Sequence, residues 1–268
     1  KITYTSVNTD MTAFHESFDA ALRLVRGKAG REHPLWIDGK AVNSASPLLV
    51  DTSPIDASLV LGKFAAAAPE HVDLAVKAAE RAQKRWGALP WQERVKTLRK
   101  AAAAIRERKF EIAAVMSLEV GKSRVEAMGD AEESADLIDY YAMNVTDNNG
   151  YVVPLGKLLP NENTRSVLRP FGVFVCIAPF NFPMALSTGM SAAALLAGNA
   201  VVYKPAQDTP WTGLMLYECY LAAGLPAGLF SFVTGLGSVI GDCFWKNPGV
   251  DGIVFTGSKE VGMRMVKE

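Results

Sequence analysis

The chain is poor in the residues that build covalent and metal-bound frameworks. Its three cysteines, Cys176, Cys219 and Cys243, are an odd number, and no two are close in sequence. Neither a disulfide framework nor a CxxC metal site is expected, and a reducing cytoplasmic location is favoured. The three histidines are scattered along the N-terminal part without ligand spacing, so no metal site is predicted.

An excess of either charge is also missing. Lys plus Arg and Asp plus Glu both number 28, so nothing indicates binding to nucleic acid or an anionic membrane. Residues 171–203 carry no charged side chain, but Pro179, Asn181, Pro183 and Gly189 divide them into pieces too short to cross a bilayer. A buried strand, loop and helix are expected there instead.

Neither end of the chain shows a clear boundary. It begins with Lys1, without a signal peptide, and its last six residues, MRMVKE, are typical of a helix interior. We therefore expect a trimmed N-terminus and a piece of a longer protein. The 268 residues suffice for one large domain or two small ones.

Helical periodicity dominates the first 150 residues. A short hairpin is predicted over 35–42, with Asp38-Gly39 as its turn, and residues 43–68 are predicted as loop and extended chain. Residues 151–170 alternate in an extended manner and predict a protruding arm. Helices are expected over about 69–87, from about 91, over about 110–119 and over about 123–144.

After residue 170, short apolar strands alternate with helices. Such strands indicate a parallel sheet covered on both faces, so the predicted fold is α/β, Rossmann-like, with an open parallel sheet. We treat 1–268 as one cofactor-binding domain with a helical part (1–150), an extended arm that would serve oligomerisation (151–170) and a βα repeat (171–268). Strands are predicted over 173–177, 200–203, 229–233 and 252–255, and helices over 184–197, 211–223, 238–245 and from 258.

Small or polar residues follow each predicted strand, at the sheet edge where ligands of doubly wound folds lie. Each cluster taken alone has a plain structural interpretation. Lys204 is most simply a solvated charge, Ser258 a helix N-cap, and Gly235-x-Gly237-x-x-x-Gly241 a turn rather than the common dinucleotide fingerprint. The clusters read APFNFP, KPAQ, GLG and TGS in chain order.

Taken together, PFNFP, KPA, AGLPAGLFSFVTGLG, FTGS and the earlier LEVGK resemble the aldehyde dehydrogenase superfamily. The resemblance implies that Asn181 donates to the oxyanion of a thiohemiacetal, whereas by itself it would be a turn-forming residue. It also implies a cofactor site made by Ile177, Ala178, Pro179, Phe180, Lys204, Ala206, Gln207, Gly237, Gly241, Phe255, Thr256, Gly257, Ser258 and Val261.

Within this implied site, Lys204 hydrogen-bonds the adenosine ribose. Gln207 stands where many NAD-using members have Glu, so NAD is expected and NADP use stays open. Gly237 and Gly241 approach the adenine. Gly257 and Ser258 contact the pyrophosphate at a helix N-terminus, and Val261 packs nearby.

PLWIDGK and EVGKSRVEAMGDAEESADLIDYYA are most similar to the branch that oxidises L-glutamate γ-semialdehyde, the open form of 1-pyrroline-5-carboxylate, in proline catabolism. There, an acidic residue near Asp130 and the aromatic Phe180 line the aldehyde pocket. The alternatives are a helix-surface charge for Asp130 and a core position for Phe180.

In this family the nucleophilic cysteine and the base glutamate follow the FTGS helix, beyond Glu268. The three cysteines of this chain are expected to be buried and structural, so the 268 residues are predicted to bind cofactor without turning over aldehyde. The resemblance implies a homo-oligomer. Another aldehyde specificity and a non-catalytic nucleotide-binding or assembly module remain alternatives; a longer reading frame with a cysteine and an ELGGK-like segment would exclude the module.

Overall fold

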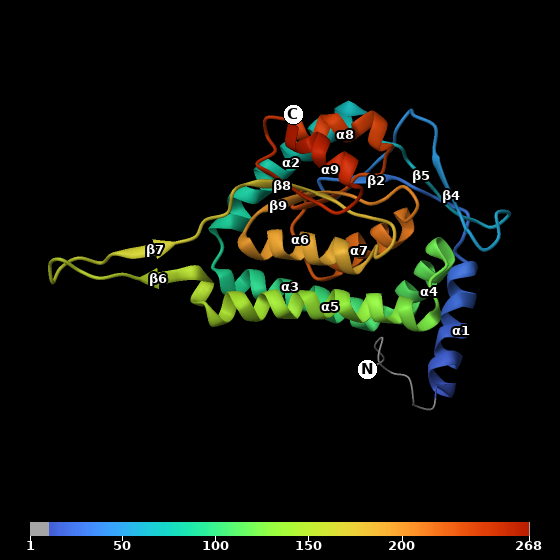
Figure 1. The fold of residues 1–268 in the computed structure, drawn as a ribbon, viewed down its shortest axis with the longest axis horizontal. Helices are drawn as coiled ribbons and strands as arrows, with labels where there is room; N and C mark the ends of the chain where they lie inside the picture. The colour runs from blue at the N-terminus through green and yellow to red at the C-terminus, as the bar shows by residue number, and fades with distance from the viewer. Residues whose placement is uncertain (1–10, 268) are drawn as a thin grey trace.

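A mixed six-stranded sheet forms the centre of the molecule in the computed structural model, which describes residues 11–267 (Figure 1). Lys1 and Glu268, on which the expectations about the chain ends partly rest, lie outside these residues. The strand order is β11-β8-β9-β10-β2-β3. The strands are β2 (Leu35–Ile37), β3 (Lys40–Val42), β8 (Val173–Ile177), β9 (Ala200–Lys204), β10 (Phe230–Phe232) and β11 (Gly252–Phe255).

Four of these strands are parallel, as the apolar runs predict. β9 lies between β8 and β10, and all five of its residues are buried, which is typical of a strand covered on both faces. The predicted hairpin is confirmed, with positive φ at both Asp38 and Gly39. Its antiparallel attachment to β10, through Phe232 and Trp36, was not predicted. Local turn signals do not reveal such a long-range pairing, which is accompanied by stacking of Trp36 on Tyr217.

Helices cover both faces of the sheet (Figure 1). On one face lies α2 (Pro69–Ala88), with α8 (Gly237–Trp245) above it and α9 (Lys259–Lys267) beside it in the view. On the other lie α6 (Ala185–Ala197) and α7 (Pro210–Ala222). An outer layer of α3 (Trp91–Glu107) and α5 (Arg124–Asp147) packs on α6 and α7, and α4 (Lys109–Val120) packs between α1 (Thr12–Arg26), α5 and α7.

Local signals explain where several of these helices begin and end. Pro69 is the first residue of α2, where its missing N–H costs nothing. α4 ends at Gly121, whose φ of 70° favours glycine. Ser123 and Glu126 form a capping box at the start of α5. The predicted helices from residue 69 onward are therefore confirmed, within a few residues at each end.

The first 68 residues contain more structure than we predicted. α1 was missed, although its buried Phe14, Phe18, Ala21 and Val25 recur at helical spacing. A second sheet, β1-β5-β4, lies largely in the stretch expected to be loop and extended chain. Its strands are β1 (Arg31–His33), β4 (Leu49–Thr52) and β5 (Val60–Phe64).

Two further expectations concern exposed and uncharged segments. The predicted arm is a hairpin of β6 (Val152–Pro154) and β7 (Arg165–Val167), which projects far from the rest of the molecule (Figure 1). The uncharged run 171–203 forms a strand, a loop, a helix and most of a second strand, as expected. Within residues 11–267, no helix is long and apolar enough to span a membrane.

Candidate functional site

The clusters that follow the parallel strands meet at one edge of the sheet. The Ala178 N–H donates to the Lys204 carbonyl (3.1 Å), which joins the loop after β8 to the end of β9. The Thr256 N–H donates to the Ile177 carbonyl (3.1 Å), which joins β11 to the same loop. The structure thus brings the ends of these strands together, as strand order alone predicts.

Asn181 lies in the loop between β8 and α6 and is exposed. Its Oδ1 accepts a hydrogen bond from the N–H of Phe182 (3.1 Å). Because a backbone N–H needs an acceptor, this contact identifies the amide oxygen and directs the NH2 group away from that N–H. The side chain therefore offers a fixed donor to a group outside the loop.

The glycines of the predicted cofactor site differ in whether packing within the chain leaves room for a side chain. A Cβ on Gly241 would lie 3.1 Å from the Trp245 ring, and one on Gly257 would lie 2.6 Å from the Phe255 ring, so packing within the chain accounts for both. A Cβ on Gly237 would meet nothing within 4 Å. No side chain caps the start of α8 at Gly237, which leaves this helix end suited to close approach by a ligand.

Lys204 is buried at the end of β9, which contradicts the interpretation as a solvated charge. Its side chain donates from Nζ to the Pro205 carbonyl (3.0 Å). Burial lowers the pKa of Lys204 to about 8, and the nearby charge of Asp208 opposes that shift. The ammonium group is therefore desolvated and held at the ligand edge of the sheet.

Phe180 and Gln207 line one hollow, of about 320 Å³. Phe180 is 56% exposed, so the alternative of a core position is wrong. Asp208, next to Gln207, lines the same hollow. A carboxylate therefore does lie near the predicted adenosine end, although Gln207 itself is neutral, and the sequence prediction did not weigh it.

A second, larger hollow of about 710 Å³ lies between the end of β11 and α9. Phe255, Thr256, Gly257 and Ser258 are among its lining residues. Ser258 Oγ also accepts from the Val261 N–H (3.3 Å), so the plain N-cap interpretation is confirmed.

Asp130 is fully buried, so both sequence interpretations of it need correction. It is not a surface charge, and its carboxylate is turned inward, because Oδ2 accepts from Lys122 (2.7 Å) and Oδ1 from the Ala185 N–H (2.6 Å). Glu133, nearly one turn later on α5, is exposed and lines a hollow beside Phe182. Helical spacing from the buried Ala131 and Ala135 places Glu133 on another face and could have identified it.

Two of the cysteines are buried, as expected. Burial raises the pKa of the Cys176 thiol in β8 strongly and that of Cys219 in α7 to about 11, so neither is an activated nucleophile. Cys243 in α8 is only partly buried, which corrects the expectation for that residue. Its Sγ lies 3.9 Å from the Val239 carbonyl.

Sequence reasoning missed a buried pair of carboxyl groups, Asp51 and Glu119. Glu119 Oε1 accepts from the Trp211 N–H (2.6 Å), and Oε2 accepts from the N–H (2.9 Å) and hydroxyl of Thr212. Burial raises the pKa of Asp51 to about 7, and the charge of Asp208 adds to that shift while a hydrogen bond with Glu119 opposes it. Burial also raises the pKa of Glu119 well above its usual range, and the charge of Asp51 adds to that shift. No group of three His, Cys, Asp or Glu side chains suited to a metal ion occurs between residues 11 and 267.

Comparison with known proteins places the chain in a family. Residues 42–268 match the model of the aldehyde dehydrogenase family. The chain is 36% identical over 259 residues to 1-pyrroline-5-carboxylate dehydrogenase of Geobacillus sp. (strain WCH70), covering 96% of the chain and 50% of the relative. It is 38% identical over 250 residues to 1-pyrroline-5-carboxylate dehydrogenase 2 of Halalkalibacterium halodurans, covering 93% and 48%.

Solved structures of dehydrogenases are also similar to this chain. The chain is similar to 1-pyrroline-5-carboxylate dehydrogenase from Thermus with bound NAD, with a TM-score of 0.92 and 36% identity, over all of this chain and 51% of the other. It is also similar to an NADP-dependent glyceraldehyde-3-phosphate dehydrogenase from Bacillus halodurans complexed with NADP, with a TM-score of 0.82, 33% identity and coverage of 88% and 50%. The chain spans about half the length of the relatives it matches.

Proposed function

This chain belongs to the aldehyde dehydrogenase family, and we propose that it is the cofactor-binding half of an enzyme that oxidises an aldehyde to a carboxylate with NAD(P). The observation that carries this proposal is the Asn181 amide, whose oxygen is bound by the Phe182 N–H while its NH2 group stays available. A donor fixed before the reaction stabilises negative charge as it develops on the aldehyde oxygen.

The proposed substrate is L-glutamate γ-semialdehyde. The relatives named 1-pyrroline-5-carboxylate dehydrogenase support this choice. Glu133 beside Phe182 adds a carboxylate at an apolar hollow, where a ligand ammonium group would find an opposite charge. Another aldehyde is the second candidate, because the structures of similar chains include the glyceraldehyde-3-phosphate dehydrogenase.

The residues at the sheet edge fit a dinucleotide. Gly237 lies at the start of α8, which no side chain caps, and a Cβ at this position would meet no other atom of the protein within 4 Å. Packing within the chain therefore does not require glycine here, whereas the close approach of a bound ligand would. Lys204 and Gln207 would contact the adenosine ribose, and Gly257 and Ser258 the pyrophosphate. When bound, the nicotinamide cofactor accepts the hydride of the oxidation. We propose NAD as the cofactor, with NADP also admitted because Gln207 carries no charge.

The nucleophile is proposed to be none of the three cysteines, since two are inert by burial and Cys243 lies in α8, away from the loop of Asn181. The 268 residues by themselves are then expected to bind NADH without forming it.

We further propose a cytoplasmic homo-oligomer whose contacts include the projecting β6-β7 hairpin, on which Leu158 is 93% exposed.

The test uses the complete polypeptide with NAD and glutamate γ-semialdehyde, followed at 340 nm. Asn181→Ala should lower kcat by about 10²–10³ while the KM for NAD barely changes. Near-normal turnover would show that Asn181 is only a turn residue. If the wild-type complete polypeptide binds NADH but forms none with any aldehyde, the alternative of a non-catalytic nucleotide-binding module is favoured.

A further inference from the structure

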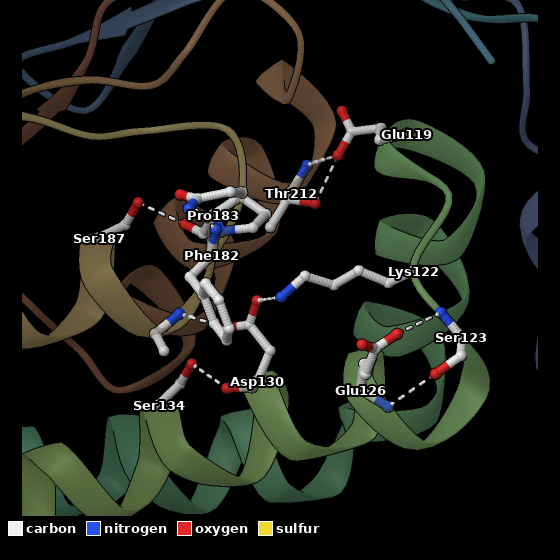
Figure 2. Close-up of polar contacts among 12 residues, drawn as sticks. Glu119, Lys122, Ser123, Glu126, Asp130, Ser134, Phe182, Pro183, Ser187 and Thr212 are labelled. Atoms are coloured by element: carbon white, nitrogen blue, oxygen red, sulfur yellow. Dashed lines mark hydrogen bonds and ion pairs between the residues drawn. The ribbon is translucent and has the colours of Figure 1, made fainter. Parts of the chain in front are cut away.

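A buried ion pair lies directly beneath the loop that carries Asn181 (Figure 2). Lys122, in the turn between α4 and α5, places its Nζ 2.7 Å from Oδ2 of Asp130 on α5. The side chains are 11% and 0% exposed. Removing either charge from such a pair leaves the other charge buried without a partner, which lowers the stability of the folded protein.

Both partners of the pair also contact the loop segment that follows Asn181. The Nζ of Lys122 lies 3.6 Å from the centre of the Phe182 ring, within the range of a cation–π contact. Oδ1 of Asp130 accepts from the N–H of Ala185, the first residue of α6 (2.6 Å). This contact also favours the carboxylate through the positive end of the α6 dipole. The loop is thus fixed one residue and four residues after Asn181.

The contact with Phe182 reaches Asn181 itself. The N–H of Phe182 donates to Oδ1 of Asn181, so the position of Phe182 sets the direction of the amide. Figure 2 shows Lys122 and Asp130 extending from α4–α5 toward the loop, with the Phe182 ring beside the end of the Lys122 side chain.

We propose that Lys122 and Asp130 are positioning residues that hold the Asn181 amide in the orientation its catalysis needs. The proposal rests on the proposed function, because it assumes that Asn181 donates to the oxyanion. The pair touches neither substrate nor cofactor in this account. It acts through the Phe182 ring and the Ala185 N–H, and its loss would misplace the donor rather than remove it.

The first experiment compares matched variants of the complete polypeptide. Lys122→Met removes the ammonium group, and Asp130→Asn keeps an oxygen for the Ala185 N–H while it removes the charge. Each should lower kcat by about 10- to 100-fold, as expected for a misplaced group, with the KM for NAD changed less than about twofold. Lys122→Arg keeps the charge and the ring contact and should restore most of kcat.

A second ion pair, between α4 and α5, supplies the control. Lys109 and Glu132 lie 2.7 Å apart with exposed fractions of 30% and 5%, and the ammonium group of Lys109 lies over the Phe110 ring instead of the Phe182 ring. Lys109→Met and Glu132→Gln should destabilise the protein comparably and leave kcat near the wild-type value. Equal losses of kcat in both pairs would overturn the proposal, since they would reflect general destabilisation.

The second experiment is a double-mutant cycle with Asn181→Ala. If the pair acts through Asn181, then Lys122→Met in the Asn181→Ala background should change kcat by less than about twofold. Fully additive losses would overturn the positioning role. If Lys122→Met yields no folded protein, Asp130→Asn takes its place in the cycle. Normal kcat in Asn181→Ala alone would instead refute the oxyanion role, and additive losses beside an impaired Asn181→Ala would refute only the positioning role.

Discussion

The starts of α6 and α7 are built alike but charged differently. Neither helix has a side-chain cap of its own, and each receives a carboxylate from the outer helices: Asp130 of α5 binds the start of α6, and Glu119 of α4 binds the start of α7. Asp130 lies against Lys122, whereas Glu119 lies near Asp51. One helix start is therefore capped by an ion pair, and the other by a carboxyl group that lies beside a second carboxyl group.

The comparison teaches that burial alone does not decide the charge of a helix cap. Burial raises the pKa of Asp130 as it does that of Glu119, but the charge and hydrogen bond of Lys122 oppose the shift at Asp130. At Glu119 the neighbouring carboxyl group adds to the shift, although the Thr212 and Trp211 donors oppose it. The two pKa shifts therefore differ because Asp130 has a cation, Lys122, as its neighbour, whereas Glu119 has a second carboxyl group, Asp51.

The largest effect is expected from removing the cation of the α6 cap. Lys122→Met leaves the Asp130 charge buried and unpaired, which should cost about 3–5 kcal/mol of stability and lower the thermal midpoint by on the order of 10 °C. Glu119→Gln, which leaves no opposite charge unpaired, should cost less. Calorimetry of the complete polypeptide at pH 7 measures both, and an equal loss would contradict the assigned charge difference.

The α7 cap should make stability depend on pH. The pKa of Asp51 is raised to about 7 in the folded state from 3.8, so the folded state binds this proton more tightly than the unfolded state. Its contribution to stability is complete below about pH 4 and is lost as pH rises through 7, by up to about 1.4 kcal/mol per pH unit.

Asp51→Asn should flatten that decline in the thermal midpoint between pH 4 and 7. Asp208→Asn is the control, because Asp208 lies in the same hollow and adds only a charge effect to Asp51. An Asp51→Asn profile as steep as that of the wild type would show that another group causes the dependence.

A smaller effect is expected from adding a further carboxylate beside the α7 cap. Gln207→Glu should raise the KM for NADP by repulsion of the 2′-phosphate, worth roughly one to a few kcal/mol, while the KM for NAD stays nearly unchanged. Steady-state kinetics of the complete polypeptide with both cofactors measures this. An unchanged ratio of kcat/KM for NADP and NAD would mean that Gln207 does not face the ribose.

The smallest effect is expected at the start of α5, which carries its own cap. Ser123 Oγ accepts from the Glu126 N–H (3.3 Å) at an exposed site, so Ser123→Ala should cost only about 1 kcal/mol. The thermal midpoint should fall by a few degrees with kcat unaltered. A loss as large as that of Lys122→Met would mean that exposed and buried caps are energetically alike here.

The sequence was sufficient to predict elements whose signals are local. Apolar strands, the Asp38-Gly39 turn and the Gly121 helix end depend on neighbouring residues, and the structure has them where expected. The carboxyl-edge clusters also followed from strand order. The partners of Asp130 and Glu119 could not be found in this way, because Ala185 lies 55 positions from Asp130 and Trp211 lies 92 positions from Glu119.

The burial of individual polar residues also could not be predicted from the sequence. Lys204 and Asp130 are polar residues that are exposed in most proteins, so composition favoured solvent for both, yet packing between layers buries them. Glu133 and Asp130 differ by three positions on α5, and of the two only Asp130 is buried against α6.

The two helix caps also set an order of events during synthesis. Glu119 and Asp130 leave the ribosome before the helices whose first N–H groups they bind, so α6 and α7 emerge beside ready acceptors once α4 and α5 have formed. A circular permutant that translates residues 171–267 first would present those helix starts before their acceptors exist. The starts of α6 and α7 would then lack their acceptors until the outer helices were made. The incompletely folded chain would depend more on chaperones during synthesis.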